Sequence, residues 1–468
     1  MFKSLEEINK KIAEGKAVVL TAQEVVKMAK EEGISEVVKK VDVVTTGTFA
    51  PMCSSGAFIN FGHTFPPMKM EKIKLGGVEV YGGIAAVDGY LGATQKSDYD
   101  VSFGGAHIIE MLISGENILL EAWGSGTDCY PGKYFKTYIN KNTINDFFLF
   151  NPRNAYQNYA AATNGSDRTI YTYMGKLLPN YGNVNYSTSG ELSPLLKDPK
   201  MQTIGIGTKV FLGGTEGYVA WYGTQFKNVV KENEYGVPIG PSRTLALVGD
   251  AKKMSADFVK GAYFKNYGVT LFVGVGIPIP VVNEEIAYYV SLSNKEIYTE
   301  LRDYSKVERP ILKIVNYEEL QSGKIELDGK IVRTSSLTSI RKSLEIANIL
   351  KSWILEGKFL LSNPVEKLSE ERSLKSLNST FVNVDMREHY YELKSRYKRL
   401  CLNCGACIGV CEYGALYFDY LDNNSVKLNS QKCVECLLCS DVCPIGIKLP
   451  YEKNYEEMSK NEFPDSPY

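Results

Sequence analysis

A chain of 468 residues is too long for one hydrophobic core, so we expect two or more domains. With 44% hydrophobic and 23% charged residues and a net charge of −1, its composition is that of a globular protein and indicates no nucleic-acid or membrane partner. Three histidines are too few for a histidine-rich metal site. No basic and apolar signal segment follows Met1, and the apolar run 271–282 is interrupted by glycine and proline, so we expect a cytoplasmic protein.

The first 40 residues predict two short amphipathic helices, because Ser4 and Thr21 each precede an acidic turn, as a helix N-cap does. The chain then alternates β-like runs with glycine clusters and small polar residues. The predicted elements in this part are strands at 41–44, 78–81 and 118–122 and a helix at 107–114.

A β-α-β unit is predicted further along the chain. It consists of a strand at 245–248, a helix at 251–263 and a strand at 269–275. A helix at 346–357 ends at a glycine. These elements predict an α/β fold for the large N-terminal part, with a mixed α+β fold as the alternative.

Eight of the ten cysteines lie between Cys401 and Pro444, in two runs of identical spacing. In each run three cysteines, separated by two residues, are followed after three more residues by a fourth: Cys401, Cys404, Cys407 and Cys411, then Cys433, Cys436, Cys439 and Cys443. Three thiolates so spaced bind three corners of a [4Fe–4S] cube, while the fourth of each run reaches the other cube. A zinc ribbon is the alternative, but it needs only two pairs of ligands.

We therefore expect two [4Fe–4S] clusters with crossed ligand sets. The first set is Cys401, Cys404, Cys407 and Cys443, and the second is Cys433, Cys436, Cys439 and Cys411. The stretch resembles the bacterial-type two-cluster ferredoxins, a small α+β fold, although Glu412 stands where a proline commonly follows the fourth cysteine. Such clusters carry one electron each, so a low-potential electron donor is implied.

Composition divides the chain into four parts. We expect a large domain at 1–365, a charged and serine-rich linker at 366–395, the ferredoxin domain at 396–450 and a polar tail at 451–468.

Two cysteines remain outside the cluster motif, Cys53 and Cys129. Both lie among glycines and small polar residues, where backbone N–H groups can approach a thiolate and lower its pKa. This setting suits a reactive thiol, although a buried structural cysteine is an equally common alternative.

Five motifs resemble the homocysteine-biosynthesis family, which includes the L-aspartate semialdehyde sulfurtransferases of methanogens and other anaerobes. They lie at 53–63, 83–95, 104–107, 126–131 and 205–214, and the similarity covers roughly residues 10–365. The resemblance implies that Cys53 and Cys129 are the sulfur-handling thiols. It also implies an enzyme that makes homocysteine from aspartate semialdehyde and sulfide, with electrons supplied by the clusters.

One mechanism fits both domains. Sulfur held as a persulfide on one cysteine attacks the aldehyde, and the second cysteine resolves the S–S bond as a disulfide that the clusters reduce. This requires the Cα atoms of Cys53 and Cys129 to lie within about 7 Å.

Further candidates are weaker. His63 and His107 lie inside the motifs and Asp128 adjoins Cys129, so they are candidate acids or bases, although a histidine bonded to a buried carbonyl is an equal alternative. Arg153 and Arg243 lie in loop-like segments and are candidates for the substrate carboxylate. The sequence leaves open whether the protein forms a homo-oligomer.

Two other functions remain open. The chain can be an electron-transfer or sulfur-relay subunit of a larger complex, in which case neither cysteine carries sulfur. It can also be a ferredoxin-linked oxidoreductase of another aldehyde, which would need no sulfide and would form an acid or an alcohol.

Overall fold

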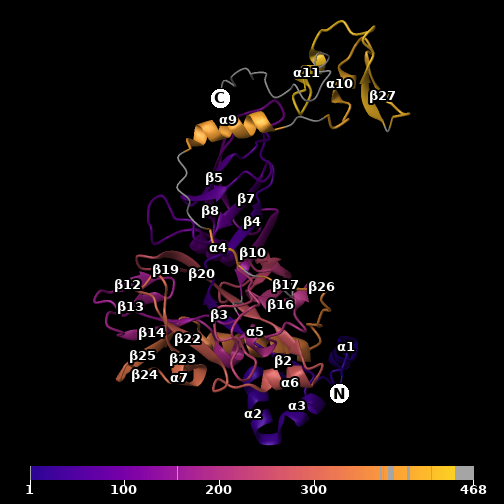
Figure 1. Ribbon diagram of the computed structural model, residues 1–468. Helices are drawn as coiled ribbons and strands as arrows, with labels where there is room; N and C mark the ends of the chain where they lie inside the picture. Colours follow the sequence, from indigo (N-terminus) through magenta and orange to yellow (C-terminus); the bar gives the residue numbers. More distant parts are fainter. Residues whose placement is uncertain are drawn as a thin grey trace. The chain divides into compact units, whose positions relative to one another are not determined.

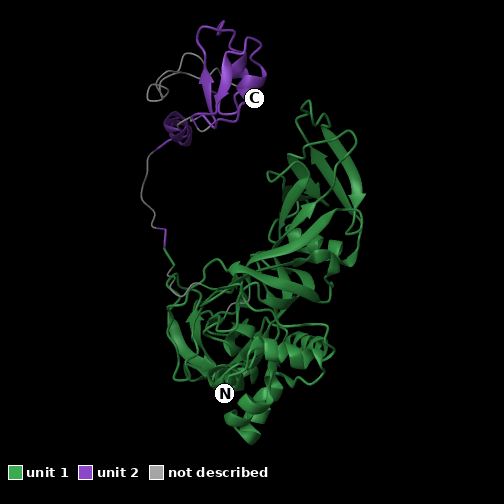
Figure 2. Ribbon diagram, turned by 90° about the vertical axis from the view of Figure 1, so that its right-hand side faces the viewer, with its two compact units in different colours: residues 1–375 green, residues 376–468 purple. Residues whose placement is uncertain are grey.

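The structure, a computed structural model, describes residues 2–154, 157–368, 372, 374–377, 384–397, 401–422 and 424–447. It divides into two compact units, residues 1–375 and 376–468 (Figure 2). The predicted polar tail 451–468 and several residues of the predicted linker lie outside the described residues. Unit 1 is a sheet-rich mixture of α and β structure and unit 2 holds a small α+β region, which confirms the predicted fold class.

Three short helices open the chain, where two were predicted: α1 (Leu5–Ala13), α2 (Ala22–Glu32) and α3 (Ile34–Lys40). Both predicted N-caps are confirmed. The Ser4 hydroxyl accepts a hydrogen bond from the Glu7 N–H at 3.1 Å, and the Thr21 hydroxyl accepts one from the Glu24 N–H at 3.3 Å. In each case the glutamate bonds back to the cap N–H, which completes a capping box. Gly33, with φ of 91°, separates α2 from α3.

One sheet, with thirteen strands among the described residues, organises unit 1. Its pairs are antiparallel, and its strands follow the order β19 (Val259–Phe264), β20 (Gly268–Gly276), β16 (Lys209–Leu212), β17 (Thr215–Tyr222), β18 (Leu245–Asp250), β10 (Asp146–Asn154), β4 (Gly56–Asn60), β7 (Asp88–Gly92), β6 (Val78–Tyr81), β5 (Lys72–Leu75), β8 (Ile118–Trp123) and β9 (Tyr134–Ile139), while β3 (Thr48–Pro51) pairs with β20. The strands predicted at 78–81, 118–122, 245–248 and 269–275 are confirmed. Strands β5 to β9 form an arm at one end of the sheet (Figure 1).

Helix α4 (Gly105–Ser114) covers the inner face of this sheet. It packs against β4, β7 and β8 and also against β19. A Cβ on Gly261 of β19 would lie 2.8 Å from the His107 backbone, so only glycine allows this approach. Side chains of the arm alternate strictly: Val78 and Val80 are buried while Glu79 and Tyr81 are exposed. The arm therefore has one face in the core and one in solvent.

The rest of unit 1 contains two further sheets. The six-stranded one has the order β23 (Ile311–Asn316), β22 (Tyr298–Asp303), β11 (Ala161–Thr163), β14 (Asn183–Tyr186), β25 (Lys330–Ser336) and β24 (Lys324–Leu327). The three-stranded one has the order β1 (Val19–Thr21), β2 (Val43–Thr45) and β21 (Pro278–Pro280). The remaining elements of this unit are β12 (Ile170–Thr172), β13 (Gly175–Leu177), β15 (Gly205–Ile206), β26 (Glu366–Lys367), α5 (Pro194–Lys197), α6 (Glu284–Ser291) and α7 (Tyr317–Gln321).

Helix α8 (Ile340–Leu355) packs against β1, β3 and β20. The predicted helix at 346–357 is confirmed, but it begins six residues earlier because Ser339 accepts a hydrogen bond from the Lys342 N–H and caps the N-terminus.

The predicted helix at 251–263 is wrong. Only Ala251–Lys253 forms a 3₁₀ turn, capped by the Asp250 side chain, and 259–264 is strand β19, which pairs antiparallel with β20. Val259 is buried opposite Val273, and Gly261 lies against α4. Packing against elements distant in sequence thus outweighs local helix propensity. The predicted β-α-β unit is accordingly an antiparallel arrangement.

Unit 2 contains α9 (Met386–Arg396), α10 (Ala406–Gly409), the antiparallel strands β27 (Leu416–Asp419) and β28 (Ser425–Leu428), and α11 (Leu438–Asp441). Two elements occupy parts of the predicted linker 366–395: β26 pairs with β15 of unit 1, and α9 covers its last ten residues and ends one residue beyond it.

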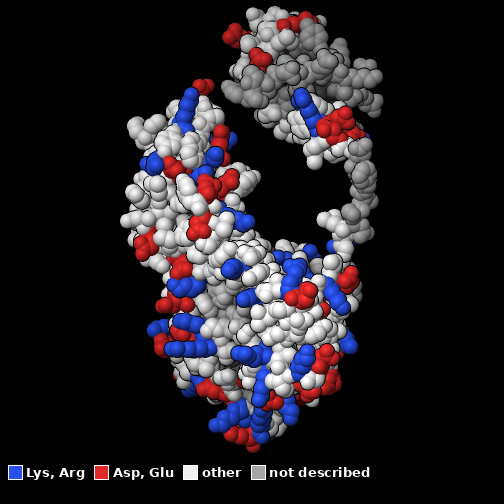
Figure 3. All heavy atoms as spheres, turned by 90° about the vertical axis from the view of Figure 1, so that its left-hand side faces the viewer, with Lys and Arg blue, Asp and Glu red and all other residues white. Residues whose placement is uncertain are grey.

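The charged side chains on the face seen in Figure 3 are of mixed sign, with Lys and Arg interspersed among Asp and Glu over unit 1. Charges so mixed produce no extended field of one sign on that face. Among the described residues, no helix is long and apolar enough to cross a membrane.

Candidate active site and cluster-binding sites

Cys53 lies in the turn between β3 and β4. The turn is closed by Ser55, whose N–H and hydroxyl both donate to the Met52 carbonyl, at 3.1 and 2.7 Å. The thiol is half-buried, and two hydroxyl groups from β20 and the turn before it point at its sulfur. The Thr270 hydroxyl donates to Sγ at 3.4 Å and the Tyr267 hydroxyl at 3.9 Å.

Arg153 lies near the same turn, and its charge acts on the Tyr267 phenol that contacts Cys53. The Ser54 hydroxyl donates to the Arg153 carbonyl at 3.0 Å, which links the cysteine turn to β10. The guanidinium forms no hydrogen bond or ion pair with any residue that the structure describes, and its Nε is buried. A buried donor without an acceptor is costly, so such a group is typically completed by a ligand.

Tyr267 joins these two groups electrostatically. Burial raises the pKa of its phenol, the neighbouring Cys53 sulfur raises it further, and Arg153 opposes the shift. The phenol therefore stays protonated at neutral pH and remains a hydrogen-bond donor to Cys53.

Tyr173, Tyr304 and Arg309 form a cluster that packs against Tyr267. The rings of Tyr267 and Tyr173 meet edge to face with centroids 6.1 Å apart. Tyr173 donates to the Tyr304 hydroxyl at 3.1 Å, and Arg309 donates to the Tyr173 hydroxyl at 2.8 Å. These contacts fix Tyr173, so Tyr267 is held in place over Cys53. None of these residues carries a sequence motif, and Tyr267 is 214 residues from Cys53 along the chain.

Cys129 lies in a separate place, the exposed loop that joins β8 to β9. Mutual backbone hydrogen bonds between Thr127 and Tyr130, at 2.9 and 3.1 Å, form a tight turn around it. The Thr127 hydroxyl lies 3.5 Å from the Cys129 sulfur. His63 stacks on Tyr130 with centroids 6.3 Å apart, and Asp128 is exposed. His63 and Asp128 therefore belong to the Cys129 loop and not to Cys53.

The resolving step requires Cys53 and Cys129 to come within disulfide reach, and the strand geometry does not bring them together in a single copy of the chain. Cys53 precedes the first residue of β4, whereas His63, which contacts the Cys129 loop, follows the last. The five residues of β4 alone span roughly 13 Å, almost twice the largest Cα separation of a disulfide. A direct resolving step between the two thiols is not available in this arrangement.

Two other predicted site residues have structural partners. His107 accepts a hydrogen bond from the Gly104 N–H at 3.2 Å at the start of α4, and burial lowers its pKa. Arg243 donates to the Pro199 carbonyl at 2.6 Å and to Gln157 at 3.3 Å, and burial lowers its pKa too. Its guanidinium is thus engaged by the protein, unlike that of Arg153.

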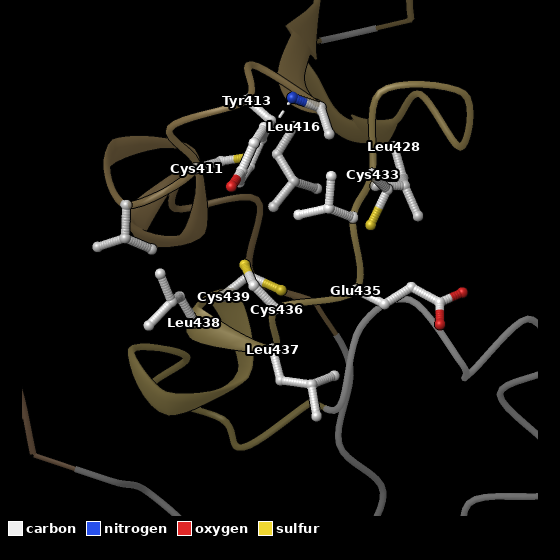
Figure 4. Close-up of a pocket in the computed structure, with 13 residues that line it drawn as sticks. Cys411, Tyr413, Leu416, Leu428, Cys433, Glu435, Cys436, Leu437, Leu438 and Cys439 are labelled. Carbon is white, nitrogen blue, oxygen red and sulfur yellow. Dashed lines mark hydrogen bonds between the residues drawn. The ribbon is translucent and has the colours of Figure 1, made fainter.

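Two hollows in unit 2 are lined by the two predicted ligand sets. Cys411, Cys433, Cys436 and Cys439 line a hollow with about 400 Å³ of empty space, and their sulfur atoms converge on it (Figure 4). Cys401, Cys404, Cys407 and Cys443 line a second one of about 620 Å³. Apolar side chains, among them Leu416 and Leu428, border both.

The backbone around these cysteines also fits iron–sulfur clusters. The N–H groups of Asn403, Ala415 and Ile447 donate to the sulfurs of Cys401, Cys411 and Cys443 at 3.3–3.4 Å, a contact that tunes cluster potential. Among the described residues, no three His, Cys, Asp or Glu side chains gather closely enough to hold a single metal ion.

The two cysteine runs have matching backbone conformations. Asn403 and Gly405 flank the second cysteine of the first run with φ of 52° and 77°, and Glu435 and Leu437 do so in the second run with φ of 56° and 65°. Left-handed residues are costly unless they are glycine, so Leu437 is held there by the loop around the hollow. At Gly405 a Cβ would lie 2.4 Å from the Phe418 ring.

Two family models match the chain. Residues 17–361 match the model described as homocysteine biosynthesis enzyme, sulfur-incorporation, and residues 400–447 match a 4Fe-4S dicluster domain. A ferredoxin of Pyrobaculum islandicum is 39% identical over 46 residues, or 10% of this chain and 41% of its own length. No solved structure matches the chain.

Two relatives of known activity match most of the chain. An L-aspartate semialdehyde sulfurtransferase of Methanosarcina acetivorans is 49% identical over 381 residues, which are 81% of this chain and 74% of the relative. The enzyme of the same name from Methanocaldococcus jannaschii is 47% identical over 396 residues, or 80% of this chain and 75% of the relative. With the family model spanning residues 17–361, the chain belongs to the homocysteine-biosynthesis family of sulfur-incorporating enzymes.

Proposed function

We propose that this protein is an L-aspartate semialdehyde sulfurtransferase, which forms L-homocysteine from the aldehyde and sulfide. One observation supports the proposal beyond the similarity to the two relatives: Tyr267 contacts the half-buried Cys53 thiol and also interacts with the charge of Arg153, whose guanidinium has no partner among the described residues. A thiol for sulfur chemistry and a cation for a carboxylate are the two groups that this substrate requires.

Arg153 holds the α-carboxylate of the substrate. The guanidinium supplies two parallel donors, which suit the two oxygens of a carboxylate. The aldehyde carbon then lies toward Cys53, whose sulfur accepts hydrogen bonds from the hydroxyl groups of Thr270 and Tyr267. Tyr267 is also the protonated group in this site that can donate to the oxygen leaving the aldehyde carbon.

The overall reaction fixes the number of electrons. With sulfide it is R-CHO + H₂S + 2e⁻ + 2H⁺ → R-CH₂-SH + H₂O. If sulfur arrives instead as the zero-valent atom of a persulfide, four electrons are consumed. The electron count per homocysteine therefore identifies the sulfur donor.

The two hollows of unit 2 hold the clusters in crossed ligand sets. We assign Cys401, Cys404, Cys407 and Cys443 to one [4Fe–4S] cluster and Cys433, Cys436, Cys439 and Cys411 to the other, which the lining of the hollows supports. Each bound cluster supplies one electron at a time from a low-potential donor, so two clusters match the two-electron demand.

Cys129 has a role separate from the aldehyde site. Its exposure and its place in a tight polar turn suit a thiol that accepts zero-valent sulfur from a small persulfide, which leaves as the thiol (R-SSH + Cys-SH → R-SH + Cys-SSH). Asp128 on the same loop and His63, which stacks on Tyr130 of that loop, are the groups available to move its proton. Sulfur bound there reaches Cys53 only through a movement of the chain or from another copy.

Two domains follow from this assignment. The sulfur-transfer domain comprises residues 1–365 and the ferredoxin domain residues 396–450. The division into compact units at 375 and the two family matches support this organisation.

The test is anaerobic turnover of the cluster-loaded chain with aspartate semialdehyde, sulfide and a low-potential reductant. Homocysteine should form with two reducing electrons each and only when sulfide is present. An acid or alcohol product formed without sulfide, or no turnover by the fully loaded chain, contradicts the proposal.

A further inference from the structure

The outer face of the arm carries an ordered set of side chains, whereas the described helix that packs on the arm, α4, lies on its inner face. Strands β6, β5, β8 and β9 lie side by side in this order, and β9 is the last strand of the sheet. The inward side chains of β6, β5 and β8 are buried and those of β9 are partly buried, while α4 packs on the inner face of the sheet. The outward side chains of these four strands are the subject of this inference, which is independent of the proposed function.

These outward side chains form two rows across the four strands, fixed by the strand register. The first row is mainly aromatic and consists of Tyr81, Lys72, Trp123 and Tyr134. The second row is charged with alternating sign and consists of Glu79, Lys74, Glu121 and Lys136. Together these eight residues form the arm patch.

The arm patch exposes more aromatic surface than a free sheet face normally does. Tyr81 is 65% exposed and Tyr134 is 54% exposed. Lys72 lies 5.6 Å from the centre of the Trp123 ring. Clustered exposed aromatic side chains of this kind, beside charges of both signs, are typical of a protein interface.

The patch is complementary to itself. A two-fold axis parallel to the strands, between β5 and β8, reverses the order of the four strands and keeps each row facing the same row. The facing pairs are then Tyr81 with Tyr134 of the partner subunit, Lys72 with Trp123 of the partner subunit, Lys74 with Glu121 of the partner subunit, and Glu79 with Lys136 of the partner subunit. Every pair is favourable: one aromatic, one cation with an aromatic ring, and two of opposite charge.

The other possible axis fails. An in-plane axis perpendicular to the strands would lay each row on the other row along the same strand. Lys72 would then face Lys74 of the partner subunit, and Tyr81 would face Glu79 of the partner subunit. Like charges in contact repel, so the charge pattern selects the axis parallel to the strands.

We propose that the arm patch is the interface of a homodimer in which two arms pack face to face. Sheets pack in this way with nearly aligned strands at a separation of about 10 Å. Within the chain, Lys136 already pairs with Glu121 at 2.9 Å and Lys74 pairs with Asp98. Glu79 interacts with the charge of Lys74 across the strand pair but forms no hydrogen bond or ion pair in the described part of the chain, so it is free to pair with Lys136 of the partner subunit.

The size of the patch makes this dimer reversible. Four strands at about 4.8 Å and four residues at about 3.3 Å per strand give a plan of only roughly 19 by 13 Å, below the area of a standard stable interface. Trp123 and Tyr134 flank the Cys129 loop on its two sides. Dimerisation therefore immobilises the base of that loop without covering Cys53.

The test is sedimentation equilibrium of the cluster-loaded full chain over a range of concentrations at low salt. The wild type should show a reversible monomer–dimer equilibrium. Glu79→Lys and Lys136→Glu should each raise the dimer dissociation constant about tenfold. Each variant gives residues 79 and 136 the same charge, and the two-fold axis places this pair in contact twice. The double variant should return to within about threefold of the wild type, since it exchanges the charges of a facing pair.

The matched control is Glu308→Lys, which makes the same charge change at an exposed position outside the arm and should leave the equilibrium unchanged. Equal thermal unfolding of all variants shows that each is folded. A wild type that stays monomeric at every concentration overturns the proposal. A dimer that the single variants leave intact, or that the double variant fails to restore, also overturns it.

Discussion

Replacing Arg153 with glutamine removes the cation that we assign to the substrate carboxylate. The guanidinium donates to no protein group among the described residues, and its Nε is buried. The variant therefore loses no hydrogen bond of the folded chain and should unfold at nearly the wild-type temperature. Any effect on turnover then comes from the missing contact with substrate.

The expected magnitude follows from the bond that is lost. A hydrogen bond between charged partners contributes about 1.5–3 kcal/mol, which corresponds to a roughly 10- to 150-fold decrease in kcat/KM. Because the carboxylate does not change during the reaction, most of this loss should appear as a higher KM. Arg153→Lys should recover part of it, since lysine keeps the charge but not the paired donors.

The assay is anaerobic homocysteine or thiol formation with two aldehydes, aspartate semialdehyde and 3-aminopropanal, which lacks the carboxylate. The wild type should prefer the first, and Arg153→Gln should lose that preference because its rate with 3-aminopropanal is unchanged. If Arg153→Gln slowed both aldehydes equally, or neither, the carboxylate assignment would be refuted.

Three further outcomes follow from the structure. Cys443→Ser should disturb the cluster bound by the first cysteine run, and Cys411→Ser should disturb the cluster bound by the second. Iron content and electron paramagnetic resonance of each variant measure this. If each variant instead disturbed the cluster of its own run, the crossed ligand sets would be contradicted. Tyr267→Phe should slow alkylation of Cys53 roughly three- to tenfold, because this factor corresponds to the free energy of one neutral hydrogen bond. An unchanged rate would show that Tyr267 does not act on Cys53. Burial lowers the pKa of Lys197 from 10.5 to about 8, so the unfolded chain binds this proton before the folded chain as pH falls. The free energy of unfolding should therefore decrease by up to about 3 kcal/mol as the pH falls from 10.5 to 8. In Lys197→Met the unfolding temperature should depend less on pH over this range. The same pH dependence in the variant and the wild type would contradict this.

Features encoded by neighbouring residues were predictable from the sequence. The caps at Ser4 and Thr21 are set by residues three positions away, and both helices begin there. The crossed cysteine sets follow from spacing alone, because each hollow of unit 2 is lined by the set that the spacing predicts.

Features that depend on distant contacts were not predictable. The segment 251–263 has the composition of a helix, but pairing with β20 and packing against α4 make most of its second half a strand. Tyr267 and Thr270 reach Cys53 from a hairpin more than 200 residues away, and no local pattern indicates it. The separation of Cys53 from Cys129 likewise depends on the strand order, which spacing does not reveal.

Single turnover with isotopically labelled sulfide tests the central claim most directly. Aspartate semialdehyde and labelled sulfide are added to three proteins: the wild type, Cys53→Ser and Cys129→Ser. Each protein is loaded with clusters and reduced anaerobically beforehand. Labelled homocysteine should form in the wild type and in Cys129→Ser, because free sulfide bypasses the exposed loop, and should be absent in Cys53→Ser. Labelled homocysteine formed by Cys53→Ser at the wild-type rate would show that sulfur transfer does not take place at Cys53.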